Sequence, residues 1–359
     1  MTQIATLQII GSKKLGGAES FFVRLHEALV RSESLSSIAI TPPTSELRDS
    51  LVEPMATSPM RSVFDPFSRF GLSRLIKQYH PDIVQTWMGR ATRLVHLNLS
   101  KGPVHVARLG GFYDPKQYQH AHALVGNTQS ICDFLIQSGV PSAKVSFISN
   151  FVAVPEATPE EKLQSIRQEL QLPDDAVIIF SLGRLHHNKA FDTLINAFEQ
   201  LAREYQDRPV HLLIAGDGPL KSQLEHQANT STVTNQIHWL GWQRNPTPYF
   251  HLADFFVCPS RHEPLGNVLL EAWAHACPVV STRSHGALEL IDDGVSGLLC
   301  DVEDAHQMAS QMLMMLEASE AERQSLIDQG AKVLDLRFSE RVILASYQDL
   351  YEQLLKRSR

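Results

Sequence analysis

Short apolar runs alternate along the chain with longer amphipathic stretches. Residues 5–10 form an apolar run that predicts a strand. The next stretch, residues 18–30, predicts a helix because its apolar side chains share one face: Phe21, Phe22, Leu25, Ala28 and Leu29. Further strands are predicted at residues 36–41, 82–87, 104–108, 123–127 and 144–149, with helical stretches between several of them. This alternation predicts a parallel sheet covered by helices on both faces.

The pattern is interrupted at residues 150–162, which contain two prolines and no periodicity, and which we interpret as a linker. The alternation then resumes, and an amphipathic helix is predicted at residues 339–357. We therefore expect two doubly wound α/β units, each binding ligands beyond the carboxyl ends of its strands, with a cleft where they face each other. The strands predicted for the second unit cover residues 176–183, 210–216, 236–241, 253–260 and 278–282.

Composition excludes several classes of protein. The 359 residues are 43% hydrophobic and 20% charged, which is ordinary for a folded protein. The four cysteines form no CxxC pair, which argues against a disulfide scaffold or a structural zinc site and fits a reducing cytosol. The first residues do not resemble a secretory signal, and no apolar run approaches the ~20 residues of a membrane span.

Charge is distributed unevenly. The net charge of −7 disfavours a dedicated nucleic-acid binder, but residues 1–150 carry +5 and the remainder −12. An anionic membrane surface or acceptor is one candidate partner for the basic half, and a chance excess on a solvated surface is the alternative.

Several common ligand motifs are missing. The run GSKKLGG at 11–17 lacks the GK[ST] of a P-loop, and GDGPLK at 216–221 is not GxGxxG. No Asp-x-Asp occurs, which weakens any mechanism that needs a metal bridging a diphosphate. His120 and His122 are two residues apart and do not share a helix face, so we expect solvated histidines rather than a metal site.

Three segments carry candidate chemistry, and the first two follow predicted strands. Gly16 and Gly17 open a helix, where free backbone N–H groups suit an anion, although a plain tight turn is the alternative. Arg184 and Lys189 lie beyond the strand at 176–183 and could hold a diphosphate without metal. Two solvated cations are the alternative there. The helix that follows them has the predicted core positions Leu194, Ile195, Ala197, Phe198 and Leu201.

The third segment is residues 259–280, with a helix predicted from about 264 to 276 because Pro264 suits a first helical turn. Glu263 would then lie at the helix start, where an ordinary acidic residue is the alternative. Glu271 would lie about 80° further around the helix. Because Glu271 lies in the apolar run VLLEAWA, it needs a partner.

Taken in order, these motifs resemble the retaining nucleotide-sugar glycosyltransferases of group 1 (family 4), which have the GT-B fold. The motifs are GGAE (16–19), NTQSICDFL (127–135), FISN (147–150), SLGRLxxxK (181–189), AGDGPL (215–220), HWLGW (238–242), EPLGNVLLEAWAxACPVV (263–280) and DDGVSGLL (292–299). The resemblance covers nearly the whole chain, is strong over 176–300 and is weaker over 40–110.

The resemblance implies a role for each matching residue. Arg184 and Lys189 correspond to the basic pair that stabilises the departing diphosphate. Glu263 corresponds to the glutamate facing the donor sugar, and Glu271 to the one on the ribose. The implied catalytic residues are Arg184, Lys189 and Glu263. The implied nucleotide-sugar-binding residues are Gly16, Gly17, Arg184, Lys189, Gly216, Leu240, Leu265, Gly266, Asn267 and Glu271.

The resemblance also implies two Rossmann-like domains facing across a cleft. The acceptor-side domain would span 1–152 with a C-terminal helix at 340–359, and the nucleotide-sugar domain would span 153–339. Two positions depart from the family. Leu109-Gly110-Gly111 stands where many relatives have a histidine, His105 being inside the preceding strand, and Ala190 replaces the usual glycine after the lysine.

The predicted function is therefore metal-independent, retaining transfer of a sugar from a nucleotide sugar, UDP-linked rather than GDP-linked, with no cofactor. The expected acceptor is a lipid-linked or lipopolysaccharide-type glycan, met in the cytoplasm or at the inner face of its membrane. Basic residues of the first half favour that acceptor: Lys13, Lys14, Arg24, Arg61, Arg69, Arg74, Lys77, Arg90 and Arg93. A degenerate nucleotide-sugar-binding protein and a sugar-nucleotide epimerase on the same fold are the alternatives.

Overall fold

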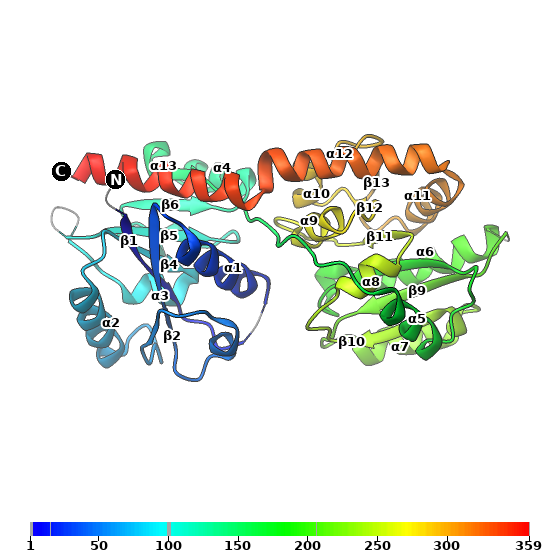
Figure 1. Ribbon diagram of the computed structural model, residues 1–359, viewed down its shortest axis with the longest axis horizontal. Coiled ribbons are helices and arrows are strands. Elements are labelled where there is room, and N and C mark those ends of the chain that lie inside the picture. Colours follow the sequence, from blue (N-terminus) through cyan, green and yellow to red (C-terminus); the bar gives the residue numbers. More distant parts are fainter. Residues whose placement is uncertain (1–2, 15, 99–101, 206, 359) are drawn as a thin grey trace. The chain divides into compact units, whose positions relative to one another are not determined.

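The computed structural model describes residues 3–14, 16–98, 102–205 and 207–358. The chain divides into two compact units, one formed by residues 1–152 and 337–359 and the other by residues 153–336 (Figure 1). Each unit contains one all-parallel sheet flanked by helices, which confirms the predicted pair of doubly wound α/β units.

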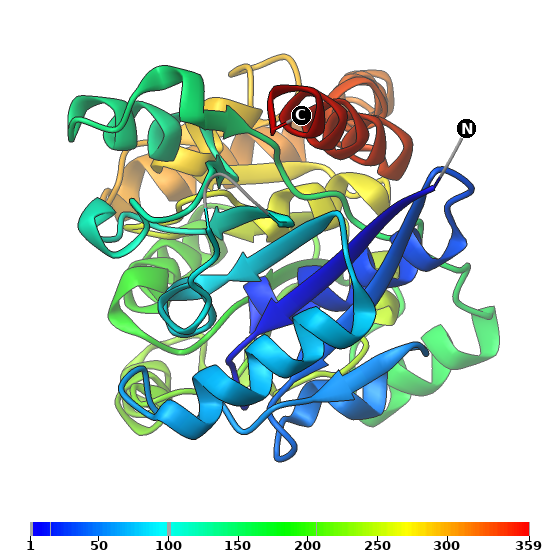
Figure 2. The ribbon, with the colours of Figure 1, turned by 90° about the vertical axis from the view of Figure 1, so that its left-hand side faces the viewer.

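Within its described residues, the first unit has a seven-stranded sheet in the order β3-β2-β1-β4-β5-β6-β7 (Figure 2). Six of these strands match predicted ones. The prediction missed β3 because its three residues lie between Pro54 and Pro59 and are not part of a longer apolar run. The strands are β1 (Ile4–Ile10), β2 (Leu35–Thr41), β3 (Met55–Thr57), β4 (Ile83–Trp87), β5 (Val104–Leu109), β6 (Ala123–Gly126) and β7 (Val145–Phe147).

Helices cover both faces of this sheet. The predicted apolar face of α1 (Gly17–Arg31) is buried in one hydrophobic cluster together with α13 (Glu340–Ser358). The opposite face carries α2 (Pro66–Tyr79) and α3 (Met88–Leu94) in a second cluster, and α4 (Gln129–Gln137) in a third. In Figure 2, α2 lies across the face nearest the viewer, with no other segment in front of it.

The helix α13 belongs to the first unit although almost two hundred residues of the other unit separate it from β7. Tyr347 and Tyr351 are fully buried there. Arg108 of β5 donates to the Tyr347 hydroxyl at 2.8 Å, and the Tyr351 hydroxyl donates to Gln85 of β4 at 2.8 Å. The last residue of the predicted helix, Arg359, lies outside the described residues.

His120 and His122 of this unit make specific contacts, whereas the sequence analysis expected both side chains to be solvated. The ring of His120 stacks on His96 at 4.3 Å between centroids and its Nε2 lies 2.9 Å from the Thr92 carbonyl. His122 Nδ1 accepts a hydrogen bond from the backbone N–H of His105. The side chain of His105 is fully buried, and the residue lies inside β5 as predicted. Burial, together with the neighbouring histidines, lowers the pKa of His105 to about 3. No group of His, Cys, Asp or Glu able to hold a metal occurs among the residues that the structure describes.

In the part of the second unit that is described, a six-stranded sheet runs in the order β10-β9-β8-β11-β12-β13. The prediction missed only the short β13. The strands are β8 (Val177–Leu182), β9 (Val210–Ala215), β10 (Ile237–Gly241), β11 (Phe255–Cys258), β12 (Val279–Thr282) and β13 (Leu298–Cys300).

The helices of this unit differ from prediction in two places. The predicted linker is shorter than expected because α5 (Glu160–Glu169) begins inside it. The helix expected at 264–276 is only α9 (Asn267–Ala274), because Gly266 has a left-handed backbone with φ of 80°. The other helices are α6 (Phe191–Glu204), α7 (Lys221–Thr230), α8 (Thr247–Leu252), α10 (His285–Leu290), α11 (Ala305–Glu317) and α12 (Glu320–Phe338). All five predicted core positions of α6 are buried.

Among the described residues, no helix is long and apolar enough to cross a membrane.

Candidate functional site

The candidate site lies at the carboxyl ends of the strands of residues 153–336, where ligands of doubly wound sheets bind. The loops after β8, β9 and β10 pack there backbone against backbone. Gly183 donates its N–H to Ala215 at 3.0 Å, and Gly216 donates its N–H to Gly241 at 2.8 Å. A Cβ at Gly216, whose φ is 145°, would lie 1.9 Å from the Gly183 carbonyl oxygen, so only glycine fits.

Lys189 and Glu263 form the central contact of the site. Lys189 ends a single 3-10 turn (His187–Lys189) after β8, and Glu263 lies in the loop after β11. Their side chains form an ion pair and are only 23% and 12% exposed. The buried member of the predicted glutamate pair is thus Glu263, whereas Glu271 on α9 is half-buried.

Electrostatics couple the two glutamates to Lys189. Burial by itself disfavours the charged ammonium of Lys189, but the neighbouring groups, with the carboxylate of Glu263 first among them, together outweigh burial and the pKa of Lys189 is raised. Glu271 adds a smaller contribution in the same direction. The structure therefore brings Lys189, Glu263 and Glu271 into one electrostatic group. Arg184 lies exposed on the same loop as Lys189, with no ion-pair partner among the described residues.

The prediction that Glu263 occupies the start of a helix is wrong. Glu263 lies four residues before α9, and its carbonyl oxygen accepts the N–H of Gly286 at the start of α10 at 2.8 Å. Leu265 and Gly266 are buried in the turn between them, and Asn267 begins α9. Because Glu263 is outside the helix, the 80° relation expected between the two glutamates does not apply.

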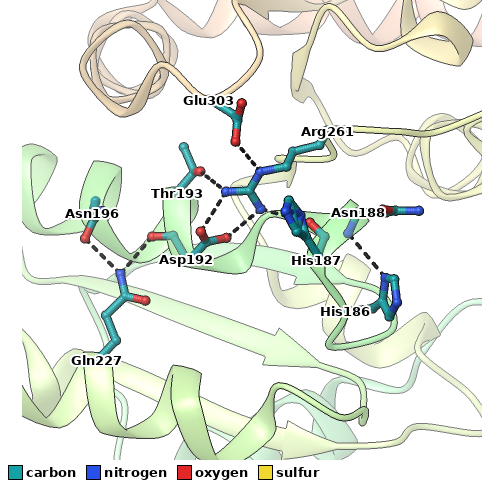
Figure 3. A network of polar contacts seen from close by, with 9 residues as sticks. All are labelled: His186, His187, Asn188, Asp192, Thr193, Asn196, Gln227, Arg261 and Glu303. Atoms are coloured by element: carbon teal, nitrogen blue, oxygen red, sulfur yellow. Dashed lines mark hydrogen bonds and ion pairs between the residues drawn. The ribbon is translucent and has the colours of Figure 1, made fainter.

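Arg261, which the sequence analysis did not single out, fastens the loop of Lys189 to the loop of Glu263 (Figure 3). Its guanidinium donates to both carboxylate oxygens of Asp192, at 2.9 and 2.6 Å, and to the carbonyl of His187 at 2.8 Å. A further bond of 2.6 Å reaches Glu303 after β13. This network raises the pKa of Arg261, and although burial opposes the change, the guanidinium lowers the pKa of Asp192.

The remaining predicted residues are distributed over both units. Leu240 is half-buried in β10, next to the loop of Gly216. Gly16 and Gly17 belong to the other compact unit, at the carboxyl end of β1, where Gly17 begins α1 and the Gly16 carbonyl accepts the N–H of Ser20 at 2.9 Å.

This arrangement suits an anionic ligand. Two cations, Arg184 and Lys189, lie beyond the end of one strand, beside glycine loops that let a ligand approach the backbone closely. The carboxylate of Glu263 neutralises the ammonium of Lys189. A diphosphate would therefore compete with a carboxylate that is already in place.

Comparison with known proteins identifies the family. The family described as "Glycosyl transferases group 1" matches residues 176–318. The chain is 32% identical over 347 residues to the lipopolysaccharide core biosynthesis glycosyltransferase LpsE of Rhizobium meliloti, covering 94% of this chain and 96% of that protein. The chain therefore belongs to the group 1 glycosyltransferases, and it is a glycosyltransferase.

Other similar proteins agree with this family. The lipopolysaccharide core biosynthesis glycosyltransferase LpsD of the same organism is 29% identical over 94% of this chain and 95% of its own length. Among solved structures, a glycosyltransferase of Rickettsia africae has a TM-score of 0.84 at 18% identity, over 99% of this chain and all of that one. Anabaena HepE in complex with UDP and glucose has a TM-score of 0.78 at 18% identity, over 98% of this chain and 99% of that one. These structures share the fold, which is GT-B.

Proposed function

We propose that this protein transfers a sugar from a UDP-sugar to a lipid-linked or lipopolysaccharide-type glycan, with retention of configuration and without a metal. The observation that carries the proposal is the partly buried Lys189–Glu263 pair beside Arg184 at the carboxyl end of β8. The names of LpsE and LpsD support the acceptor, and the UDP and UDP-glucose bound to HepE support the donor.

In the proposed reaction, each residue of the site has a separate role. Arg184 and Lys189 neutralise the charge that develops on the departing diphosphate, which replaces the function of a divalent cation. When the diphosphate pairs with Lys189, the carboxylate of Glu263 is released from the lysine and accepts hydrogen bonds from the hydroxyls of the donor sugar. Glu271 holds the ribose, and Gly216 and Leu240 line the nucleotide. The leaving diphosphate departs on the face that the acceptor hydroxyl attacks, so no protein nucleophile is needed.

The proposed location follows from the acceptor. A lipid-linked glycan that is extended from a nucleotide sugar is met in the cytoplasm, at the inner face of the membrane. Peripheral association of the chain with that surface is part of this proposal.

Nucleotide binding tests the donor site directly. We would measure thermal unfolding with UDP, GDP and ADP separately, each in EDTA. A ligand at about 100 times its Kd adds about 2.7 kcal/mol to the free energy of unfolding. We expect UDP to raise the midpoint and Lys189→Met to abolish the rise, whereas Lys332→Met, an exposed lysine on α12, leaves it unchanged. No rise with any nucleotide would refute the phosphate-binding role of Arg184 and Lys189.

Transfer needs a second assay, because Leu109-Gly110-Gly111 stands where many relatives have a histidine. We expect UDP release from a UDP-sugar only when a lipopolysaccharide-type acceptor is present, also in EDTA. UDP binding without release under any acceptor would indicate the degenerate binding protein instead. Conversion of a UDP-sugar without acceptor would indicate an epimerase.

A further inference from the structure

Three phenylalanines protrude from the surface of the first unit. Phe64, Phe67 and Phe70 are 81%, 75% and 72% exposed, within seven residues of each other. No other aromatic side chain of the described chain is as exposed, Trp242 at 61% being the next. Single exposed apolar residues are common, but a cluster of large ones marks a surface that meets a partner.

The helix α2 turns two of these rings and two cations to the same side. Phe67, Phe70, Arg74 and Lys77 follow the spacing i, i+3, i+7, i+10, which places them on one stripe, and all four are exposed. Leu72 and Ile76, on the other side of α2, are buried against the sheet. The exposed stripe is therefore set by how α2 packs.

The turn before α2 is fixed by hydrogen bonds, so the exposure of Phe64 is built into the structure. Asp65 accepts the N–H of Phe67 at 3.1 Å and the hydroxyl of Ser68 at 2.6 Å. The guanidinium of Arg69 donates to the carbonyl of Val63 at 3.3 Å. Arg93 of α3 lies 5.7 Å from the centre of the Phe64 ring and supports it from one side.

Charge indicates what this surface meets. Residues 61–77 contain four basic residues and only one acidic residue, a net charge of +3. Aromatic rings surrounded by cations suit the headgroup boundary of an anionic bilayer. A second copy of the chain fits less well, because a symmetric contact would place these cations against each other.

We propose that Phe64, Phe67 and Phe70, with Arg61, Arg74 and Lys77, dock this protein on an anionic lipid bilayer. The inference deepens the proposed function and rests on it for the nature of the acceptor. The topology agrees with that role. Phe64 lies in the connection from the carboxyl end of β3 to the start of α2, and that end of β3 is at the same edge of the sheet as Gly16 and Gly17. A lipid-linked acceptor would thus be held at the edge where this unit contributes to transfer.

The test is co-sedimentation of the full chain with vesicles of phosphatidylcholine, with and without phosphatidylglycerol. We expect binding only to the anionic vesicles and a fall from about 0.1 M to about 1 M salt, where the screening length shrinks from about 10 Å to about 3 Å. Phe64→Ser/Phe67→Ser/Phe70→Ser should lower the partition coefficient at least tenfold. Each surface cation is worth about 1 kcal/mol, or about fivefold in binding, so Arg74→Gln/Lys77→Gln should lower it at least tenfold.

The matched control replaces three exposed apolar residues of the other unit by serine: Val154, Leu288 and Leu336, which are 91%, 55% and 60% exposed. This triple variant should bind vesicles within twofold of the unaltered chain. All variants should keep the UDP-induced rise of the thermal midpoint, which shows that they are folded. If that rise is absent from every protein while vesicle binding behaves as stated, the proposed function fails and the docking surface stands.

Three results would overturn the docking surface. The first is equal binding to neutral and anionic vesicles. The second is unchanged binding after the phenylalanine substitutions. The third is a dimer in sedimentation equilibrium that the same substitutions dissociate, which would make a second copy the occupant.

Discussion

Replacing Lys189 should separate the stability of the site from its ligand binding. In Lys189→Met, the carboxylate of Glu263, only 12% exposed, loses the cation that compensates it. Removing one partner of a fully buried ion pair costs about 3–5 kcal/mol. Because Lys189 is 23% exposed and water can reach the pair, we expect about 2 kcal/mol here.

That cost can be converted into a measurable shift of the thermal midpoint. For a unit of this size, 1 kcal/mol corresponds to about 2–4 °C, so Lys189→Met should lower the midpoint by about 4–8 °C. Three of the four tryptophans, Trp239, Trp242 and Trp273, lie in the second unit, so their fluorescence follows its unfolding.

The double variant Lys189→Met/Glu263→Gln is the decisive comparison. It removes both charges, so most of the lost stability should return, to within about 1 kcal/mol of the unaltered chain. The UDP-induced rise should stay absent in both variants, because neither has the cation for the diphosphate. The free-energy differences are best measured at pH 7–8. The pKa of Lys189 is raised on folding, so the stability from its pairing is fully present below the lysine's unfolded pKa and is lost only as pH rises through the folded one.

Two outcomes would refute this reasoning. A double variant as unstable as Lys189→Met would mean that Glu263 does not depend on the lysine charge. A full UDP response in Lys189→Met would mean that the lysine does not contact the diphosphate.

Three further predictions concern other parts of the molecule. Arg261→Met should lower turnover and UDP affinity about tenfold, because the loops of the site lose the side chain that joins them. Arg261→Lys should restore only part of the loss, since an ammonium cannot form the bidentate contact with Asp192. Full activity of Arg261→Met in an assay of UDP release would argue against this. Gly216→Ala should abolish UDP binding and lower the free energy of unfolding measured in urea. The control is Gly294→Ala, where φ is 74° but the space around a Cβ is open, and it should cost only about 1 kcal/mol. Equal effects of the two substitutions would contradict the close backbone packing at Gly216. The pKa of His105 is about 3 in the folded chain and lies below its unfolded value, so the free energy of unfolding should fall as pH drops from about 6.5 towards 4. The fall should be less steep in His105→Asn. Urea midpoints of the two proteins that change in parallel across that range would contradict the prediction.

The sequence predicts most of the fold because the buried parallel strands are continuous apolar runs that differ clearly from amphipathic helices. The prediction from sequence fails where an apolar run is short, or where a single backbone angle determines where a helix begins. The strands β3 and β13 have three residues each, and β7, which is equally short, was predicted because it lies inside the longer run at 144–149. The helix α9 begins three residues later than expected because Gly266 adopts a left-handed conformation that sequence periodicity does not reveal.

The candidate site was predicted unevenly for a similar physical reason. Lys189 and Glu263 could be named from their motifs, but their mutual ion pair depends on how two separate loops fold together. Arg261 looks in sequence like an ordinary solvated arginine, and only the structure shows its contacts with Asp192 and Glu303. The three phenylalanines at 64, 67 and 70 are visible in the sequence at helical spacing, but only the structure shows that they are exposed and that Leu72 and Ile76 form the buried side of α2.

The return of α13 to the first unit has a consequence for biosynthesis. Tyr347 and Tyr351, which help to close the core of that unit, leave the ribosome only after all of residues 153–336. At about 5–20 residues per second, this interval lasts on the order of 10–40 s. Throughout it, the nascent first unit lacks α13 and the two tyrosines that complete its core, and the second unit is complete as soon as residue 336 has been added. The unit that begins the chain is therefore the last to have all of its residues, and its core can close only after the other unit is complete.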